Sequence, residues 1–316
     1  MSITIHDIAK IAGVNASTVS RALRNDPRVK EKTRERIHGI ATQNNYILNL
    51  NAKNLINGKT GLIAFLTGSL MFDIEKDLAI YLNEFLAQHD YTLLILSYAP
   101  SPEKLFNKRL EKLTQKMCDG AIILGPNDDS LLDQRSYELI HLIKAPLIFA
   151  DRRPQNITNL PLVTTDNPIA ISGLLERTLE YEIDHVIDGY SSCNTVAIDR
   201  SLTLQRLAEK FHLPYFKNET LSEIPNNLKK AAIFVNNIAD LEIFCINDYR
   251  KYVVAAFDKR GIDTYRYSAP LIICEQDFAA IARETGNYII KNLNKQPMSI
   301  RGKILIPPKN FLIINQ

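Results

Sequence analysis

Residues 4–23 read TIHDIAKIAGVNASTVSRAL, and this segment carries the signals of two short helices joined by a turn. Thr4 and Asp7 have the spacing of a capping box, with Asp in place of the usual Glu or Gln. Gly13 can end the first helix in the left-handed conformation, and Asn15 can cap the second. Apolar residues recur at the spacing of one helical face, at Ile5, Ile8, Ala9 and Ala12. We therefore predict one helix over 5–12 and another over 16–23.

The second predicted helix has two chemically different faces. Its inward face would consist of Val19, Ala22 and Leu23. Its outward face would consist of Ser17, Ser20 and Arg21, with Ala16 at the start of the helix. Short polar and basic side chains on one helix face suit entry into the major groove of DNA. A third helix is predicted over 31–44, which completes a helix-turn-helix head.

Positive charge is concentrated at this end of the chain. Residues 1–60 carry ten Lys and Arg against four Asp and Glu, whereas the rest of the chain carries 28 bases and 31 acids. A small basic segment attached to a near-neutral body suggests that only the segment meets a polyanion. Charge alone is equally compatible with a solvated basic surface that has no partner.

Four segments together resemble the N-terminus of the LacI/GalR family of bacterial repressors. They are Ile5–Arg21, Asp26–Val29, Thr33–Ile37 and Asn45-Tyr46. The resemblance implies that the second helix reads bases in the major groove, with Ala16, Ser17 and Arg21 at base edges. It implies phosphate contacts for Asn15, Ser20 and Thr33. For Thr18, a DNA contact and a buried packing role both stay open.

Three positions depart from the family pattern. Arg24 stands where relatives usually carry Asn, and we expect it to reach a phosphate or a guanine edge. Lys30 replaces the usual Ser cap of the third helix, a loss worth about 0.5–2 kcal/mol of local stability. Leu48 stands where Pro is common. The operator is therefore expected to differ from those of relatives.

Residues 49–57 form a short segment of weak helix-forming character. Asn49 can cap a helix there, but isolated helices of this length are marginal in water. The resemblance implies a hinge that folds on DNA, pairs with its twin across a dimer axis and inserts Leu55 into the minor groove. Asn49, Ala52 and Ile56 would then belong to the DNA-binding residues. A plain flexible linker is the alternative.

Beyond about residue 60, apolar segments of strand length alternate with amphipathic helical segments. This alternation predicts an α/β body of parallel sheets with helices on both faces. About eleven predicted strands are too many for one such sheet, so we expect two lobes, with the break in the polar stretch 151–161. The resemblance implies a two-lobed, periplasmic-binding-protein-like body. The expected domains are a DNA-binding domain over 1–47, a hinge over 48–60 and a body over 61–316. Within the body, we expect the first lobe at about 61–150 and 275–297. We expect the second lobe at about 155–272 and 300–316.

Ligands of open α/β sheets bind beyond the carboxyl ends of the strands, which would place an effector in the cleft between the lobes. The resemblance implies a sugar, a sugar phosphate or a purine. Matching motifs give five effector positions, at Phe72, Asp73, Arg200, Asn237 and Asp258. Each could instead be a surface ion pair or a cap. A change of lobe spacing could stop the hinge helices from pairing, which would couple effector binding to DNA affinity.

Several other functions are disfavoured. The four cysteines form no CxxC pair and the six histidines are scattered, so we expect neither a metal nor a cofactor. We find no hydrolase, nucleotide-binding or zinc-protease motif, which predicts a protein that is not an enzyme. The absence of a long apolar run and of a secretory signal pattern predicts a cytoplasmic protein with no membrane contact and speaks against a solute-binding protein.

We therefore expect a homodimeric, sequence-specific transcriptional repressor. It would bind pseudo-palindromic double-stranded DNA with one half-site per head, and a small sugar-like effector would control it. The effector positions depart from the family pattern, so control by a protein partner, or by no effector, is the alternative. A tetramer is left open.

Overall fold

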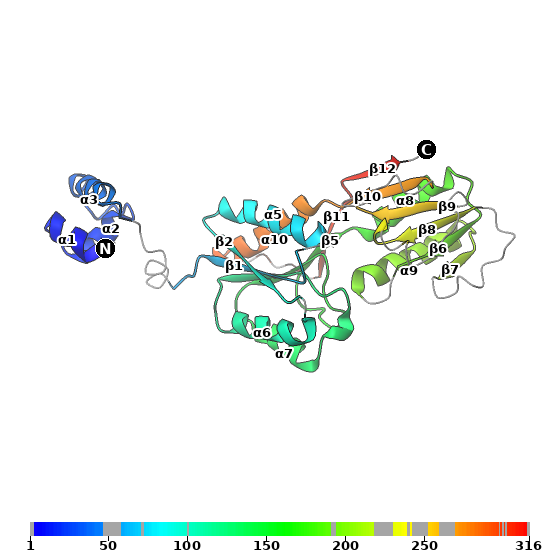
Figure 1. The fold of residues 1–316 in the computed structure, drawn as a ribbon, viewed down its shortest axis with the longest axis horizontal. Coiled ribbons are helices and arrows are strands. Elements are labelled where there is room, and N and C mark those ends of the chain that lie inside the picture. Colours follow the sequence, from blue (N-terminus) through cyan, green and yellow to red (C-terminus); the bar gives the residue numbers. More distant parts are fainter. Residues whose placement is uncertain are drawn as a thin grey trace. The chain divides into compact units, whose positions relative to one another are not determined.

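The computed structural model divides into two compact units, Met1–Thr60 and Gly61–Gln316. We call them the head and the body and describe each by itself (Figure 1). The structure describes residues 3–46, 58–70, 73–99, 101–190, 194–217, 230–238, 241, 252–258, 269–296, 298, 300 and 302–314.

The described part of the head contains the helices α1 Ile5–Ala12, α2 Ala16–Ala22 and α3 Glu31–Gln43. The predicted capping box is confirmed, since the Thr4 side chain accepts from the Asp7 N–H and the Asp7 carboxylate accepts from the Thr4 N–H at 2.9 Å. Gly13 follows α1 with φ 59°, in the left-handed region. The Asn15 side chain caps α2 by accepting from the Thr18 N–H at 2.9 Å. Local hydrogen bonding thus fixes both helix starts where the sequence predicts them.

A small apolar core joins the three helices. Ile8, Val19 and Ile37 are fully buried, one from each helix. Burying a side chain of this size contributes about 1.5–3 kcal/mol, so these three residues stabilise the whole head. Leu23, which was expected inside, is only partly buried at the edge of this core, as is Ile40. The expected missing cap is confirmed, because Lys30 at the N-cap of α3 makes no side-chain hydrogen bond to the helix.

The first lobe of the body is built on a parallel sheet with the strand order β11-β5-β4-β3-β1-β2. The strands are β1 Leu62–Thr67, β2 Thr92–Ser97, β3 Gly120–Ile123, β4 Leu147–Ala150, β5 Leu162–Thr165 and β11 Lys303–Ile306. On one face pack the helices α5 Asp73–Ala87 and α10 Phe278–Leu293. On the other face pack α6 Pro102–Thr114 and α7 Gln134–Leu142, preceded by the 3-10 turn η1 Asp129–Leu131 (Figure 1).

The second lobe has a sheet of order β12-β10-β9-β8-β6-β7, in which β12 pairs antiparallel to β10 and the other strands pair in parallel. Its strands are β6 His185–Asp188, β7 Tyr215–Lys217, β8 Ala231–Val235, β9 Tyr252–Phe257, β10 Leu271–Glu275 and β12 Asn310–Ile314. The helices α8 Asn167–Leu179 and α9 Thr195–Lys210 pack together on one face of this sheet. The predicted fold class, a helical head with a two-lobed α/β body, is confirmed.

Two strands lie in a different lobe from the one predicted. β5 and β11 were assigned to the second lobe by the limits 155–272 and 300–316, but they pair in the first sheet. The polar stretch 151–161 is therefore a connection between the neighbouring strands β4 and β5. Polar composition marks any exposed loop, so it does not distinguish such a connection from a crossing between lobes. The described chain crosses between the lobes after β5, after β10 and after β11.

Candidate functional site

The side chains around α2 form an exposed set and a half-buried set. Ser17, Arg21 and Arg24 are exposed, as is Asn15 at the cap. The other predicted contacts of the head are half-buried: Ala16, Thr18, Ser20 and Thr33. The outer face of α2 is therefore polar and basic, which is the chemistry needed to meet base edges and phosphates.

Asn15 organises the start of α2. Its Oδ1 accepts from the Thr18 hydroxyl at 2.7 Å and from the Ser17 hydroxyl at 2.8 Å, in addition to the Thr18 N–H. The Thr18 hydroxyl is thus held within the turn, which favours the structural role for Thr18. The Asn15 Nδ2 group can still donate a hydrogen bond to a phosphate.

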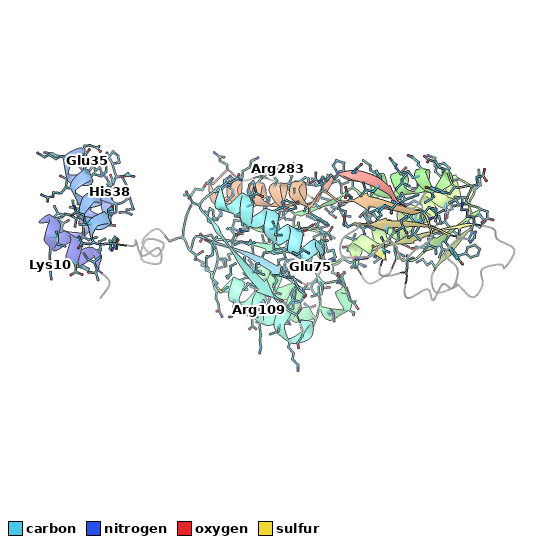
Figure 2. The ribbon with its side chains drawn as sticks, turned by 45° about the horizontal axis from the view of Figure 1, so that its top comes forward. Lys10, Glu35, His38, Glu75, Arg109 and Arg283 are labelled. Atoms are coloured by element: carbon cyan, nitrogen blue, oxygen red, sulfur yellow. The ribbon has the colours of Figure 1, made fainter. Side chains whose placement is uncertain are left out.

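The basic side chains of the head form two groups. The side chains of the first group bind partners within the head. Arg28 forms an ion pair with Asp26, Arg34 forms one with Glu31, and Arg36 donates a hydrogen bond to the Ala12 carbonyl oxygen. The hydrogen bonds from Arg28 also keep the pKa of Asp26 far below its usual range. The second group is exposed and includes Lys10, Arg21, Arg24, Lys30 and Lys32. Figure 2 shows Lys10 on α1 and Glu35 and His38 on α3.

Arg24 belongs to the exposed group and has a defined orientation. Its Nε donates to the Ser20 carbonyl oxygen at 3.1 Å, one turn earlier in the chain. His38 on α3 contacts the end of α2, because its Nε2 lies 3.1 Å from both the Ala22 carbonyl oxygen and Asn25 Oδ1. The end of α2 is thereby fixed against α3.

Part of the predicted site lies outside the described residues. This applies to the hinge positions Asn49, Ala52, Leu55 and Ile56, and to Phe72. The backbone of Asp73 begins α5, but its side chain also lies outside the described part. For these six residues the sequence predictions stay predictions.

Arg200, on α9, lies at the centre of a buried polar cluster in the body. Only 4% of this residue is exposed. Its Nε donates to Asn167 Oδ1 at 3.0 Å, its Nη1 to Asn236 Oδ1 at 2.8 Å and its Nη2 to Gln276 Oε1 at 3.0 Å. The Phe257 ring covers the guanidinium, with its centroid 3.4 Å from the Arg200 Cζ. All three guanidinium nitrogens therefore have partners within the protein.

Gln276 links Arg200 to Asp258. The Asp258 carboxylate accepts from the Gln276 backbone N–H at 2.9 Å and from the Gln276 side-chain amide at 2.6 Å. Thr165, at the end of β5, donates to Gln276 Oε1 at 2.8 Å. Burial raises the pKa of Asp258, and the hydrogen bonds from Gln276 oppose this rise. We call Thr165, Asn167, Arg200, Asn236, Asp258 and Gln276 the junction cluster, because Asn167 and Gln276 stand where the chain crosses between lobes.

The structure brings two of the predicted effector residues together and leaves a third apart. Arg200 and Asp258 belong to the junction cluster, whereas Asn237 is exposed and its neighbour Asn236 binds Arg200. Asn167, Asn236 and Gln276 were not predicted from the sequence. Each follows directly, or within two residues, the end of a strand, and this position was the signal that could have identified them.

A second buried cluster, the lobe-1 cluster, consists of Glu75, Asp151 and Arg152. Arg152 donates through Nη2 to Glu75 Oε1 at 3.3 Å and through Nε to the Gly125 carbonyl oxygen at 3.1 Å. Glu75 and Asp151 are each 2% exposed, and Figure 2 shows Glu75 on α5. Among the described residues, Glu75 Oε2 and Asp151 Oδ1 have no hydrogen-bond partner. Burial raises the pKa of both carboxyl groups, and the positive charge of Arg152 opposes it.

The two lobes also meet at the start of α9. The Asn194 side-chain amide donates to the Asn127 carbonyl oxygen at 3.0 Å, and the Thr195 hydroxyl donates to the Arg153 carbonyl oxygen at 2.8 Å. Asn127 and Arg153 follow β3 and β4, at the carboxyl edge of the first sheet. The carboxyl ends of strands from both lobes therefore border the same region.

The structure adds two negative findings within its described residues. It contains no group of three or more His, Cys, Asp and Glu side chains that could hold a metal ion. In the same part of the chain, every helix is too short or too polar to cross a membrane.

Comparison with known proteins gives a family match for the head. Residues 4–49 match the model of the bacterial regulatory proteins of the lacI family. The HTH-type transcriptional regulator DegA of Bacillus subtilis (strain 168) is 33% identical over 122 residues, which cover 39% of this chain and 36% of DegA. The maltose regulon regulatory protein MalI of Escherichia coli (strain K12) is 29% identical over 234 residues, which cover 73% of this chain and 66% of MalI. The alignments thus span between about a third and two thirds of these relatives.

A solved structure extends the likeness of fold to the body. The crystal structure of the lac repressor dimer bound to operator and the anti-inducer ONPF is similar with a TM-score of 0.77 at 18% identity, over 99% of this chain and 98% of that one. At this level of identity the likeness concerns the fold alone. The conclusion is that the head of the chain matches the lacI family of bacterial regulatory proteins, while the body shares the fold of the lac repressor.

Proposed function

We propose that this protein is a transcriptional repressor that binds a pseudo-palindromic DNA operator as a homodimer. The observation that carries this proposal is the exposed polar and basic face of α2, within a head whose residues 4–49 match the lacI family. In a two-fold dimer, two such helices would enter successive major grooves, one per half-site.

The contacts of the head follow from exposure and chemistry. Arg21 and Ser17 are exposed on α2, and we assign them to base edges together with Ala16 at the start of the helix. Ser20, Thr33 and the Asn15 amide are assigned to phosphates. Arg24 would contact DNA at the end of α2, and the hinge residues Asn49, Ala52, Leu55 and Ile56 would bind the minor groove.

Two exposed apolar side chains support a homodimer. Ile80 on α5 is 55% exposed, and Ile95 on β2, the strand at the edge of the first sheet, is 37% exposed. α5 and β2 are packed against each other, so these side chains belong to neighbouring elements. A second copy of the chain would cover apolar surface that otherwise contacts water. The lac repressor structure is described as a dimer, which agrees with this proposal.

Effector control is the second part of the proposal. A small sugar-like ligand bound between the lobes would change their spacing and with it the pairing of the hinge helices. Two similar proteins support a sugar-related ligand by their names, the maltose regulon regulatory protein MalI and the lac repressor bound to ONPF. The engagement of Arg200 by protein groups favours the alternative, a regulator without an effector.

The DNA-binding proposal can be tested with the full chain and random-sequence duplexes. Rounds of selection should enrich a duplex with two-fold related half-sites. Arg21→Ala should then weaken binding to that duplex by about 1–3 kcal/mol and relax the preference at one base pair. Arg206→Ala is the matched control, because it removes an exposed helical Arg from α9 in the body. Failure to enrich any duplex, or an equal loss in both variants, would contradict the proposal.

A further inference from the structure

We propose that His38 is a positioning residue for DNA recognition, which fixes the end of α2 and thereby the placement of Arg24. This inference rests on the proposed function and adds a half-buried residue of α3 that was not among the predicted DNA contacts. It concerns the sequence preference of the head, because Arg24 stands where the family usually carries Asn.

The chain leaves α2 through a tight turn. The Asn25 N–H donates to the Ala22 carbonyl oxygen at 2.9 Å, and the Asp26 N–H donates to the Arg21 carbonyl oxygen at 3.0 Å. Asn25 has φ 56°, in the left-handed region, which Asn adopts more readily than most residues. Arg24 directly precedes this left-handed residue, so the geometry of the turn sets where the Arg24 side chain begins.

His38 holds this turn from α3 (Figure 2). Its Nε2 faces two oxygens at 3.1 Å, the Ala22 carbonyl oxygen and Asn25 Oδ1. Two acceptors around one ring nitrogen require that this nitrogen carries a proton, so His38 donates to both. The last residue of α2 and the left-handed residue are thus tied by one side chain to a different helix.

Arg24 lies in the chain between the two residues that His38 holds. Its Nε donates to the Ser20 carbonyl oxygen at 3.1 Å, which anchors the side chain to α2 at a second point. An arginine that is already ordered loses less conformational entropy on contacting DNA than a mobile one. His38 therefore favours DNA binding by preparing Arg24 rather than by touching a base or a phosphate.

Two other roles of His38 make different predictions. A purely structural role would destabilise the whole head when His38 is removed, and would weaken binding to every duplex equally. A direct DNA contact by His38 would contribute the same amount with or without Arg24. A positioning role predicts that the contribution of His38 disappears once Arg24 is absent.

The first test compares His38→Gln with His38→Leu in the full chain, on the selected duplex and its single-base variants. A Gln side-chain amide can donate to an oxygen, whereas Leu fills space without a donor. We expect His38→Leu to weaken binding by about 2- to 10-fold, and His38→Gln to keep most of the affinity. Any change of base preference should occur only where Arg24→Ala also changes it.

His141→Leu is the matched control for this test, since it removes an exposed histidine from α7 in the body. It should leave both affinity and preference unchanged. Unchanged binding by His38→Leu, or an equal loss on the selected duplex and on random duplexes, would overturn the proposal.

A double-mutant cycle separates positioning from a direct contact. In the Arg24→Ala protein, His38→Leu should weaken binding by less than about 2-fold, because the side chain that it positions is gone. An undiminished loss in that background would contradict the positioning role.

Hydrogen exchange of the full chain without DNA tests the geometry independently. His38→Leu should speed the exchange of the Asn25 and Asp26 amides, the donors of the turn, more than that of the α1 amides. Equal acceleration throughout the head would indicate a general loss of stability and would overturn the proposal. If a duplex is enriched but the His38 variants behave like the original chain, the positioning role alone fails. If no duplex is enriched, the DNA-binding proposal fails and the positioning role with it.

Discussion

The arginines of the head and those of the body have opposite surroundings. Arg21 is exposed on α2 and Arg24 is exposed just after it, where the Arg24 Nε donates to the Ser20 carbonyl oxygen. Arg200 is buried, and all three of its nitrogens donate to protein amide oxygens. The same side chain is therefore presented to an outside partner in one unit and used to connect internal segments in the other.

This contrast shows why residue type alone does not identify a binding residue. An exposed guanidinium keeps most of its five donors for a partner, whereas a buried one must satisfy them internally. Arg200 joins Asn167 and Gln276, which lie on two of the segments that cross between lobes. We interpret Arg200 as a residue that positions these crossing segments, whereas we propose DNA contacts for Arg21 and Arg24.

The largest effect should come from removing the buried arginine. Arg200→Ala would remove the donor to the side-chain oxygens of Asn167 and Asn236, whereas Gln276 Oε1 keeps the Thr165 hydroxyl. We therefore expect the free energy of unfolding of the body to fall by about 3–5 kcal/mol. Urea denaturation followed by circular dichroism measures this loss. Arg206→Ala, an exposed change on the same helix, should stay within about 0.5 kcal/mol. A similar loss of unfolding free energy in the two variants would contradict the contrast between buried and exposed arginines.

A smaller effect is expected at the end of α2. Arg24→Asn restores the residue usual in the family, and we expect it to weaken binding to the selected duplex by about 1–3 kcal/mol. Arg24→Lys separates the two roles, because a phosphate contact tolerates Lys better than a bidentate guanine contact. Fluorescence anisotropy on the selected duplex and on single-base variants gives the answer. If Arg24→Asn left both the affinity for the selected duplex and the base preference unchanged, Arg24 would not be a DNA contact.

The missing cap of α3 predicts a stabilising substitution. Lys30→Ser supplies an oxygen that can accept from the first turn of α3, and we expect about 0.5–1 kcal/mol more stability in that helix. Hydrogen exchange of the α3 amides measures the local change. Lys32→Ser removes the same charge inside the helix and should give no such protection. Equal exchange in the two variants would show that another group already satisfies the helix start.

The weakest effect we expect is a dependence of body stability on pH. Burial raises the pKa of Glu75, Asp151 and Asp258 in the folded state. Below their ordinary values these acids are protonated in both states, and as the pH rises the unfolded chain loses its protons first. Stability should therefore fall as the pH rises from the unfolded to the folded pKa values. Asp151→Asn should flatten urea midpoints measured across pH 4 to 7, and Glu84→Gln should not.

The sequence predicted the head closely because its signals are local. The caps at Thr4, Gly13 and Asn15 depend on groups a few residues apart, so spacing alone identifies them. Strand and helix alternation likewise predicted a two-lobed body. It did not predict which lobe takes β5 and β11, because strand pairing joins residues far apart in the chain. The same limit applies to the buried clusters, where Glu75 meets Arg152 and Arg200 meets Gln276.

The sequence by itself determined the helix-turn-helix, its basic exposed face and the alternation of strands and helices, since these depend on local hydrogen bonding, periodicity and charge. Only the tertiary structure decided that Asn236 rather than Asn237 accepts a hydrogen bond from Arg200. It also decided that all three guanidinium nitrogens of Arg200 donate to groups within the protein. Tertiary structure also left one oxygen each of Glu75 and Asp151 without a partner in the described part of the chain. The physical reason is that burial and pairing depend on segments brought together from distant parts of the chain, and these set whether a polar group is available to a ligand.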